Sequence, residues 1–257
     1  MKTLFYLMVL LPYCCWNNAD AQPKNSNAVA QGGGLLKIVF NNLINHQPIV
    51  LHDSTYTNPF GETYIISKFK YYVSNTVLYT SGKANKIKND YHLINQSIDS
   101  SLSFTISLPE NQYDSIQFLL GVDSAMNTSG AQTGALDPIN DMFWTWNSGY
   151  VMQKLEGTSP QSNAMHNKME YHIGGFSGGN SVLNYLTLTF PKEKILKIRK
   201  GKMSTVIIDV AINKFWDANR IIKINDTPVC TSPGILAKEI AANFSKLFSI
   251  AEVINEK

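Results

Sequence analysis

The clearest chemical signal in the sequence is a short run of histidine and methionine residues. Residues 165–174 read MHNKMEYHIG, and four side chains in this run could bind a soft metal: Met165, His166, Met169 and His172. Imidazole and thioether groups suit copper, particularly Cu(I). In an extended strand, however, successive side chains alternate between two faces, so these four cannot converge from one flat strand. A turn would have to bring His166 back, or a distant histidine such as His46 would have to join.

An aromatic segment just before that run is the second candidate. Four aromatic residues lie within eight positions, after a long turn-rich stretch that begins near residue 121: Phe143, Trp144, Trp146 and Tyr150. In an extended chain Trp144 and Trp146 point to the same face. The ordinary interpretation is an aromatic plug under a long loop, and the functional alternative is a redox or ligand site. We expect Asp123 and Asp137 to hold the loop by accepting backbone N–H bonds.

Most of the remaining chain has the pattern of β-strands. From Leu35 onward apolar and polar residues alternate, and β-branched and aromatic residues fill 64–79, where Ser74-Asn75 is a candidate bulge. Further strand candidates are 103–108, 115–122, 149–156, 168–173, 182–190 and 203–212. Short strands separated by Asn, Gly, Pro and Ser predict an all-β fold, an antiparallel β-sandwich with long loops.

One segment has clear helical periodicity. Apolar residues from Ile235 to Phe248 cluster on one helical face. Ser232 is a candidate N-cap, with Pro233 at the first helical position. We therefore predict a C-terminal helix that closes one end of the sandwich.

The N-terminus predicts export. Lys2 precedes an apolar run over 4–13, and Ala19-Asp20-Ala21 offers small side chains at the positions that signal peptidase reads. The apolar run is too short to span a bilayer as a helix. A lipoprotein signal at Cys14 or Cys15 is the alternative, although a bulky tyrosine precedes them.

These features divide the chain into three parts. We expect a signal peptide at 1–21, a flexible leader at 22–34 and one β-sandwich domain at 35–257, in the periplasm or outside the cell. No later segment has ~18 uninterrupted apolar residues, so we expect no transmembrane segment. Without the signal, Cys230 is the only cysteine, and the core rather than disulfides must hold the fold.

Charge adds one feature. The formal net charge is +3, and the basic residues are scattered except in residues 192–202, which hold six of them. Such a run indicates either an acidic or membrane partner, or a solvated strand pair and turn. We expect no nucleic-acid partner. The sequence has no nucleophile elbow, zinc-protease, haem-attachment or phosphate-loop motif, and we therefore expect no enzyme.

Five strings in one order give the chain a resemblance to a known family. They are KFKYYVSNTVLY at 68–79, FLLGVDSAMNTSGAQTGALDP at 118–138, MFWTWNSGYVMQKLEGTSPQS at 142–162, YHIGGFSGGNSVL at 171–183 and TPVCTSPGILAKEIAANFSKLF at 227–248. They resemble the MbnP-like copper-binding proteins, in the form found in Bacteroidetes-type envelopes. The resemblance spans nearly all of residues 35–250.

The resemblance implies an extracytoplasmic β-sandwich with a copper-linked role. It also implies a di-haem cytochrome c peroxidase-like partner that oxidises a tryptophan to kynurenine, here Trp144 or Trp146. His172 matches the histidine of the family's H-[IL]-G motif. The chain departs from the copper-associated branch at Asn127, which is followed by threonine rather than histidine, and at Asn42, where some relatives carry a histidine.

Together these features predict an exported MbnP-like copper-binding protein. Its first candidate ligand is His172, with His46, His166 or Met169 as co-ligands near the Trp144/Trp146 face. The alternatives are a metal-free binding module, which presents the 121–147 loop to a protein or glycan, and a structural envelope domain.

Overall fold

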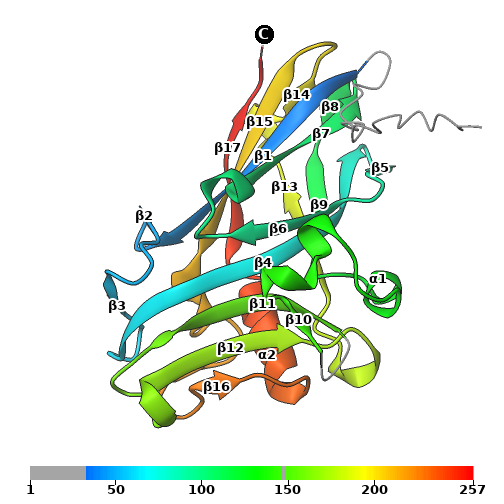
Figure 1. Cartoon of the computed structure of the whole chain (residues 1–257). Coiled ribbons are helices and arrows are strands. Elements are labelled where there is room, and N and C mark those ends of the chain that lie inside the picture. The colour runs from blue at the N-terminus through cyan, green and yellow to red at the C-terminus, as the bar shows by residue number, and fades with distance from the viewer. Residues whose placement is uncertain (1–32, 146–148, 257) are drawn as a thin grey trace, which may run out of the picture.

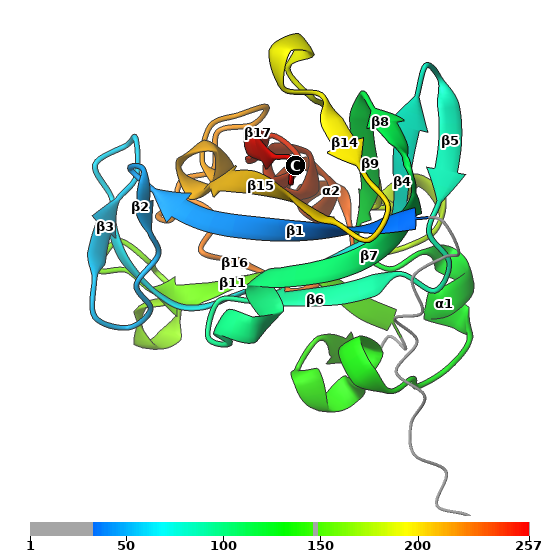
Figure 2. The same ribbon diagram turned by 90° about the horizontal axis from the view of Figure 1, so that it is seen from above.

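A computed structural model of the protein describes residues 33–145 and 149–256. The predicted signal, the leader up to residue 32 and Trp146 lie outside these residues. Within them, two β-sheets pack face to face along a common core (Figures 1 and 2). A C-terminal helix, α2 (Ile235–Phe244), packs against the sandwich near β12 (Lys168–Gly174).

The described ranges contain two larger sheets and one small one. The five-stranded sheet is made of β1 (Gly33–Ile44), β2 (Gln47–Pro48), β7 (Ser103–Pro109), β15 (Met203–Ala211) and β17 (Phe248–Ile254). The ten-stranded sheet is made of β3 (Thr55–Thr57), β4 (Thr63–Thr80), β5 (Lys83–Lys86), β6 (Tyr91–Asn95), β9 (Ser115–Leu120), β10 (Phe143–Trp144), β11 (Gly149–Thr158), β12, β13 (Asn184–Thr189) and β16 (Val229–Cys230). The small sheet pairs β8 (Asn111–Tyr113) with β14 (Leu196–Ile198).

Aromatic side chains from both sheets and from the helix form the core. Phe40 of β1 lies 6.0 Å from Tyr71 of β4 between ring centroids, and Tyr71 lies 5.5 Å from Phe244 of α2. All three are almost fully buried. Alternation along β1 buries every second residue from Leu36 to Ile44, and the residues between them, such as Lys37 and Asn41, are partly exposed. The predicted β-sandwich is confirmed.

The sheet that contains β1 is mixed rather than purely antiparallel. β1 runs antiparallel to β7 and parallel to β15, with nine residue pairs between Leu35↔Met203 and Leu43↔Ala211. About 160 residues separate these two strands in the chain. Long-range packing selects such a partner, whereas the local hydrophobic pattern of each strand is the same in either direction.

The predicted C-terminal helix is present, but its limits differ from the expectation. Gly234 occupies the N-cap without a side-chain capping bond, so Ser232 and Pro233 lie outside the helix. The helix ends at Phe244, and Phe248 begins β17, which pairs with β15. The apolar residues after Phe244 fit a helical period by chance, and pairing with β15 decides their conformation.

Three short helical pieces lie in the predicted loop between β9 and β10, and an aspartate caps two of them. Asp123 caps α1 (Ser124–Thr128) by accepting the N–H of Met126 at 3.1 Å. Asp137 caps a 3₁₀ turn, Pro138–Asn140, by accepting the N–H of Ile139 at 3.0 Å. The expected role of both aspartates is confirmed.

The predicted bulge in β4 is also present. The pairing of β4 with β9 shifts register between Ser74 and Val77, and Asn75 has φ 52°. Cys230 is buried as a free thiol. No helix among the described residues has the length and hydropathy needed to cross a bilayer.

Candidate functional site

A cleft of about 560 Å³ opens on the outer surface of the ten-stranded sheet, beside β10, β11 and β12. It contains both of the side-chain types that the sequence singled out, an indole and an imidazole. The lining residues are Asp141, Phe143, Trp144, Val151, Lys154, His172, Thr231 and Ser232. The hairpin of β11 and β12 brings together residues that are 28 positions apart, Trp144 and His172.

His172 is held in the cleft by a carboxylate on the neighbouring strand. Its Nε2 atom lies 2.8 Å from Oε1 of Glu156, and its side chain is 19% exposed. Burial alone would raise the pKa of Glu156, but hydrogen bonds from His172 and Lys68 outweigh it and lower this pKa to about 2. The ionised carboxylate accepts, so Nε2 donates and Nδ1 is left for another contact. A carboxylate behind an imidazole is the usual support of a metal-binding histidine.

The indole of Trp144 lies against the backbone of β12. A Cβ atom added at Gly174 would come within 2.4 Å of the Trp144 ring atom Cζ3. Only glycine leaves this space, and Trp144 is consequently 7% exposed. The same glycine is the last residue of β12, which also carries His172, so one element positions both groups.

A network of alternating charges surrounds His172 on this face of the sheet. Asp141 comes from the loop, where it adopts a left-handed conformation with φ 61°. One carboxylate oxygen of Asp141 lies 3.0 Å from Nζ of Lys154, and the other lies 3.0 Å from Nζ of Lys68. Lys154 also lies 3.6 Å from Glu156, and its side chain is 4% exposed. Two carboxylates thus neutralise a buried ammonium group and tie the loop to β4 and β11.

The charges in this network shift the pKa values of its members. Burial opposes ionisation of Asp141, but hydrogen bonds from Lys154 and Lys68 overcome it and lower the pKa of Asp141. Burial lowers the pKa of Lys70, which donates to the backbone carbonyl of Asn140 at 3.0 Å. The lysines therefore fix the loop that carries Trp144 through both side-chain and backbone oxygens.

The other predicted ligands lie away from this cleft. Met169 is on the opposite face of β12, where it is fully buried in the core, because strand alternation separates it from His172. His166 is exposed in the 3₁₀ turn before β12 with φ 59°. From the start of β12 at Lys168 to His172 the strand rises roughly 13 Å. The side chains of Met169 and His166 therefore do not contact His172.

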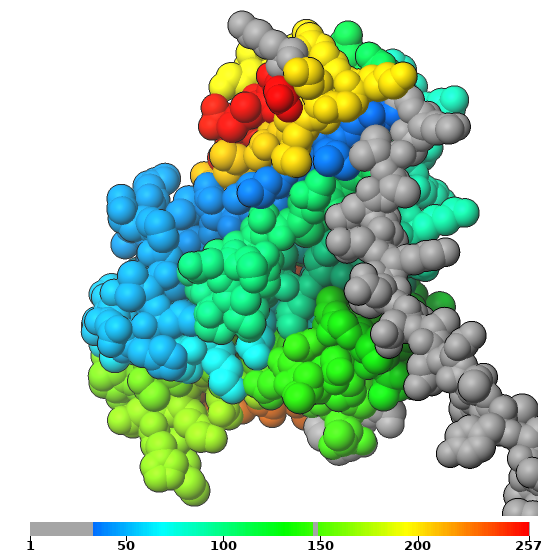
Figure 3. All heavy atoms as spheres, turned by 45° about the horizontal axis from the view of Figure 1, so that its top comes forward, coloured from blue at the N-terminus to red at the C-terminus, as the bar shows by residue number. Residues whose placement is uncertain are grey.

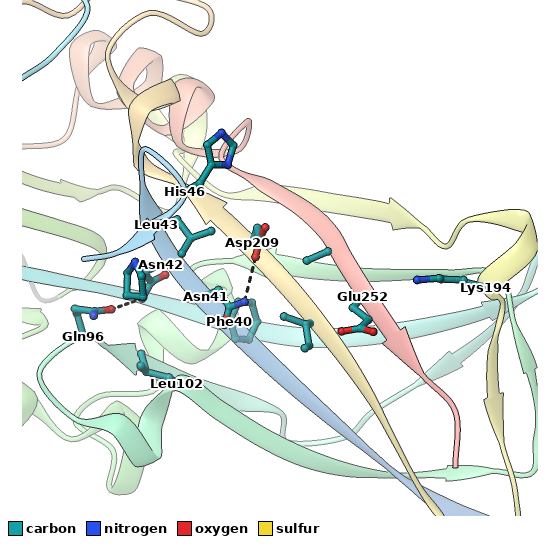
Figure 4. Close-up of a pocket in the computed structure, with 13 residues that line it drawn as sticks. Phe40, Asn41, Asn42, Leu43, His46, Gln96, Leu102, Lys194, Asp209 and Glu252 are labelled. Carbon is teal, nitrogen blue, oxygen red and sulfur yellow. Dashed lines mark hydrogen bonds between the residues drawn. The ribbon is translucent and has the colours of Figure 1, made fainter. Parts of the chain in front are cut away.

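His46 lines a different cleft, of about 660 Å³, on the five-stranded sheet. Figure 4 shows the His46 side chain among the residues that line this cleft. They include Asn41, which donates to Asp209 at 3.2 Å. In the part of the chain that the structure describes, no three His, Cys, Asp or Glu side chains form a cluster suited to a metal ion. The structure therefore brings together Trp144 and His172 but not the proposed co-ligands.

Sequence reasoning missed the charged residues of the site, among them Asp141, Lys154 and Glu156. Lys154 pairs directly with His172 in the β11–β12 register, and Glu156 lies diagonally across from it. A hairpin assumption with the correct register would have predicted the contact between Glu156 and His172. No local pattern indicates that Asp141 reaches across from the loop.

Comparisons with known proteins bear on the family and the fold of the chain. A family model described as MbnP matches residues 33–232. The structure is similar to that of MbnP from Methylosinus trichosporium, with a TM-score of 0.53, 11% sequence identity, and coverage of 86% of this chain and 99% of that chain. At this identity the likeness shows a shared fold. A search of curated proteins gives no match.

Proposed function

The chain belongs to the MbnP family, and from that premise we propose that it is an exported copper-binding protein rather than an enzyme. The cleft that contains Trp144 and His172 is its functional site. The observation that carries this proposal is that a carboxylate-supported imidazole and a shielded indole line one cleft. The proposed location is the periplasm or the cell exterior.

The residues of the cleft as they stand do not complete a copper site. Its lining contains one imidazole, from His172, and no thiolate, thioether or second imidazole among the described residues. Cu(I) prefers several soft donors, and an ammonium group from Lys154 lies on the same wall. Copper binding therefore requires a further donor from a residue that changes chemically or lies outside the described ranges.

Oxidation of Trp144 is the proposed source of that donor. Oxidative cleavage of the indole C2–C3 bond adds two oxygen atoms and gives N-formylkynurenine. Hydrolysis then releases C2 as formate and leaves kynurenine, whose aryl amine and ketone both carry lone pairs. Trp144 lies in the same cleft as His172 and packs on Gly174, which holds the ring close to the imidazole strand. A di-haem peroxidase-like partner would catalyse this oxidation, with a peroxide as the oxidant. Trp146 stays a second candidate for the modification.

Copper titration of protein purified from its native host tests the proposal. The wild type is expected to bind copper, and His172→Ala to lose more than about 100-fold in affinity, because a ligand is removed. His166→Ala is the matched control, since that histidine is exposed outside the cleft, and it should bind as the wild type does. Equal affinity of the two variants would contradict the assignment of His172.

Glu156→Gln refines the test. The amide keeps the size of the side chain but loses the charge that makes Nε2 of His172 the donor. An affinity loss of roughly 10- to 100-fold is expected for such a supporting group. An unchanged affinity would show that Glu156 serves only the ion network.

A metal-free binding module is the second candidate, favoured by one observation. Ile139, in the 3₁₀ turn of the loop, is 85% exposed, although the loop itself is well anchored. Loops held by a rigid scaffold carry a disproportionate share of binding residues. Host-purified protein with an unmodified indole and no copper affinity would favour this candidate.

A further inference from the structure

The run of basic residues in the sequence forms one end of the molecule. We call residues 192–202 the basic tip. They comprise a 3₁₀ turn (Lys192–Lys194), β14 and the turn that leads into β15. In Figure 1 this segment lies at the top, beside the end of β17, and Figure 3 shows its yellow spheres gathered on that end.

The cations of the basic tip are exposed and carry no ion pair among the described residues. All six are exposed: Lys192, Lys194, Lys197, Arg199, Lys200 and Lys202. The segment contains one carboxylate, Glu193, so its formal charge is +5, whereas the whole chain carries +3. The remainder of the chain is therefore net negative. These residues are therefore the densest run of positive charge in the sequence.

The fold holds these side chains outward. Leu196 and Ile198 are buried and alternate with Lys197 and Arg199, which are exposed. The guanidinium of Arg199 also donates to the carbonyl of Glu256 at 2.8 Å. The turn is fixed to the start of β1: the N–H of Gly201 donates to the carbonyl of Gly33 at 3.0 Å, and a Cβ at Gly34 would come within 2.2 Å of the Arg199 carbonyl oxygen. The basic tip is thus a built surface rather than a loose tail.

Two further features indicate which kind of partner binds the basic tip. Exposed apolar side chains, Met203 (42%) and Ile254 (47%), lie beside the cations. The chain also enters the fold here, because Gly33 is hydrogen-bonded to Gly201 of the turn. The segment before residue 33 therefore joins the domain at its positive end. Cations flanked by apolar groups suit the headgroup region of a bilayer.

We propose that the basic tip docks the protein on a membrane surface that contains anionic phospholipid. Lysine and arginine side chains near such a surface are attracted by its negative potential, and this attraction falls within a Debye length. The net negative remainder of the molecule is repelled, so the protein approaches with the basic tip first. The Trp144 cleft lies on the outer face of the other sheet and stays open in this orientation.

Co-sedimentation with vesicles tests the proposal. The mature protein is mixed with phosphatidylethanolamine vesicles with and without phosphatidylglycerol, at low and high salt. Binding is expected only with phosphatidylglycerol and is expected to fall as salt rises. Lys197→Glu combined with Lys200→Glu should weaken it more than about tenfold.

The matched control places the same two reversals at the other end of the strands. Lys214 and Lys246 are exposed and lie at the opposite ends of β15 and β17 from the basic tip. Lys214→Glu with Lys246→Glu should bind as the wild type does. Lys192→Glu with Lys194→Glu gives an independent second reversal within the tip, and it should weaken binding as the first does. Wild-type binding by the tip variants, an equal loss in the control, or no preference for phosphatidylglycerol would overturn the proposal.

Discussion

Two regions of this molecule use lysine in opposite ways. Beneath the Trp144 loop, Lys68 and Lys154 each lie within 4 Å of two carboxylates, and Lys154 is almost completely buried. In the basic tip, six cations are exposed without an ion pair among the described residues. The first arrangement fixes geometry at short range, because a buried charge must be neutralised where it stands. The second supplies a long-range field and places no demand on the core.

The largest expected difference between the two regions is in stability. Lys154→Ala should lower the free energy of unfolding by about 3 kcal/mol, because it leaves two carboxylates near the sheet without their buried partner. Lys197→Ala in the basic tip should change it by less than about 0.5 kcal/mol. Urea denaturation measures both. A loss below about 1 kcal/mol for Lys154→Ala would show that the network is solvated like the tip.

The next largest difference between the ion network and the basic tip is expected in the pH dependence of stability. The folded-state pKa of Glu156 is lowered to about 2 from an ordinary 4.5. The stability that this carboxylate contributes is therefore complete above pH 4.5 and is lost as the pH falls toward 2. We expect that loss to be on the order of 2 kcal/mol in the wild type and smaller in Glu156→Gln. Parallel acid-unfolding curves for the two proteins would contradict this account.

At the position before Lys154 on β11, we expect a substitution to raise the free energy of unfolding by a smaller amount. Gln153 points into the core next to outward-facing Lys154, is 2% exposed, and has neither amide atom hydrogen-bonded among the described residues. Gln153→Met should raise the free energy of unfolding by about 1 kcal/mol, because an unsatisfied buried amide is removed. Thermal denaturation against wild type measures it. A destabilised variant would mean that the amide has a partner in solution.

The smallest effect is expected for charge reversal in the basic tip. Lys197→Glu combined with Lys200→Glu should leave the free energy of unfolding within about 0.5 kcal/mol of wild type, since both side chains are exposed. Far-ultraviolet circular dichroism and urea denaturation check it. A larger loss would show that these cations hold the turn, and would weaken their use as a probe of membrane docking.

Local patterns in the sequence predicted the parts of the fold that depend on local chemistry. Alternation gave the main strands, Asp123 and Asp137 were expected as caps, and the opposite orientations of Met169 and His172 follow from the strand period. The parallel pairing of β1 with β15 and the strand β17 were not predicted. Both depend on partners far along the chain, which no local period encodes.

In the candidate site, too, local chemistry was predicted from the sequence and long-range arrangement was not. The sequence indicated Trp144 and His172 individually, and their residue types supplied that signal. Their shared cleft depends on the register of the β11–β12 hairpin, and the support from Glu156 and Asp141 depends on that register and on the loop. His46 and His166 had the right chemistry but lie elsewhere, because exposed turns hold them.

The central claim is that the indole beside His172 is oxidised to complete the site. Tandem mass spectrometry of the peptide that contains residue 144, from protein purified from the native host, tests it most directly. The account predicts a kynurenine mass at position 144 in the wild type and in His166→Ala, together with bound copper. An intact indole at 144 in protein that nevertheless carries copper would contradict it.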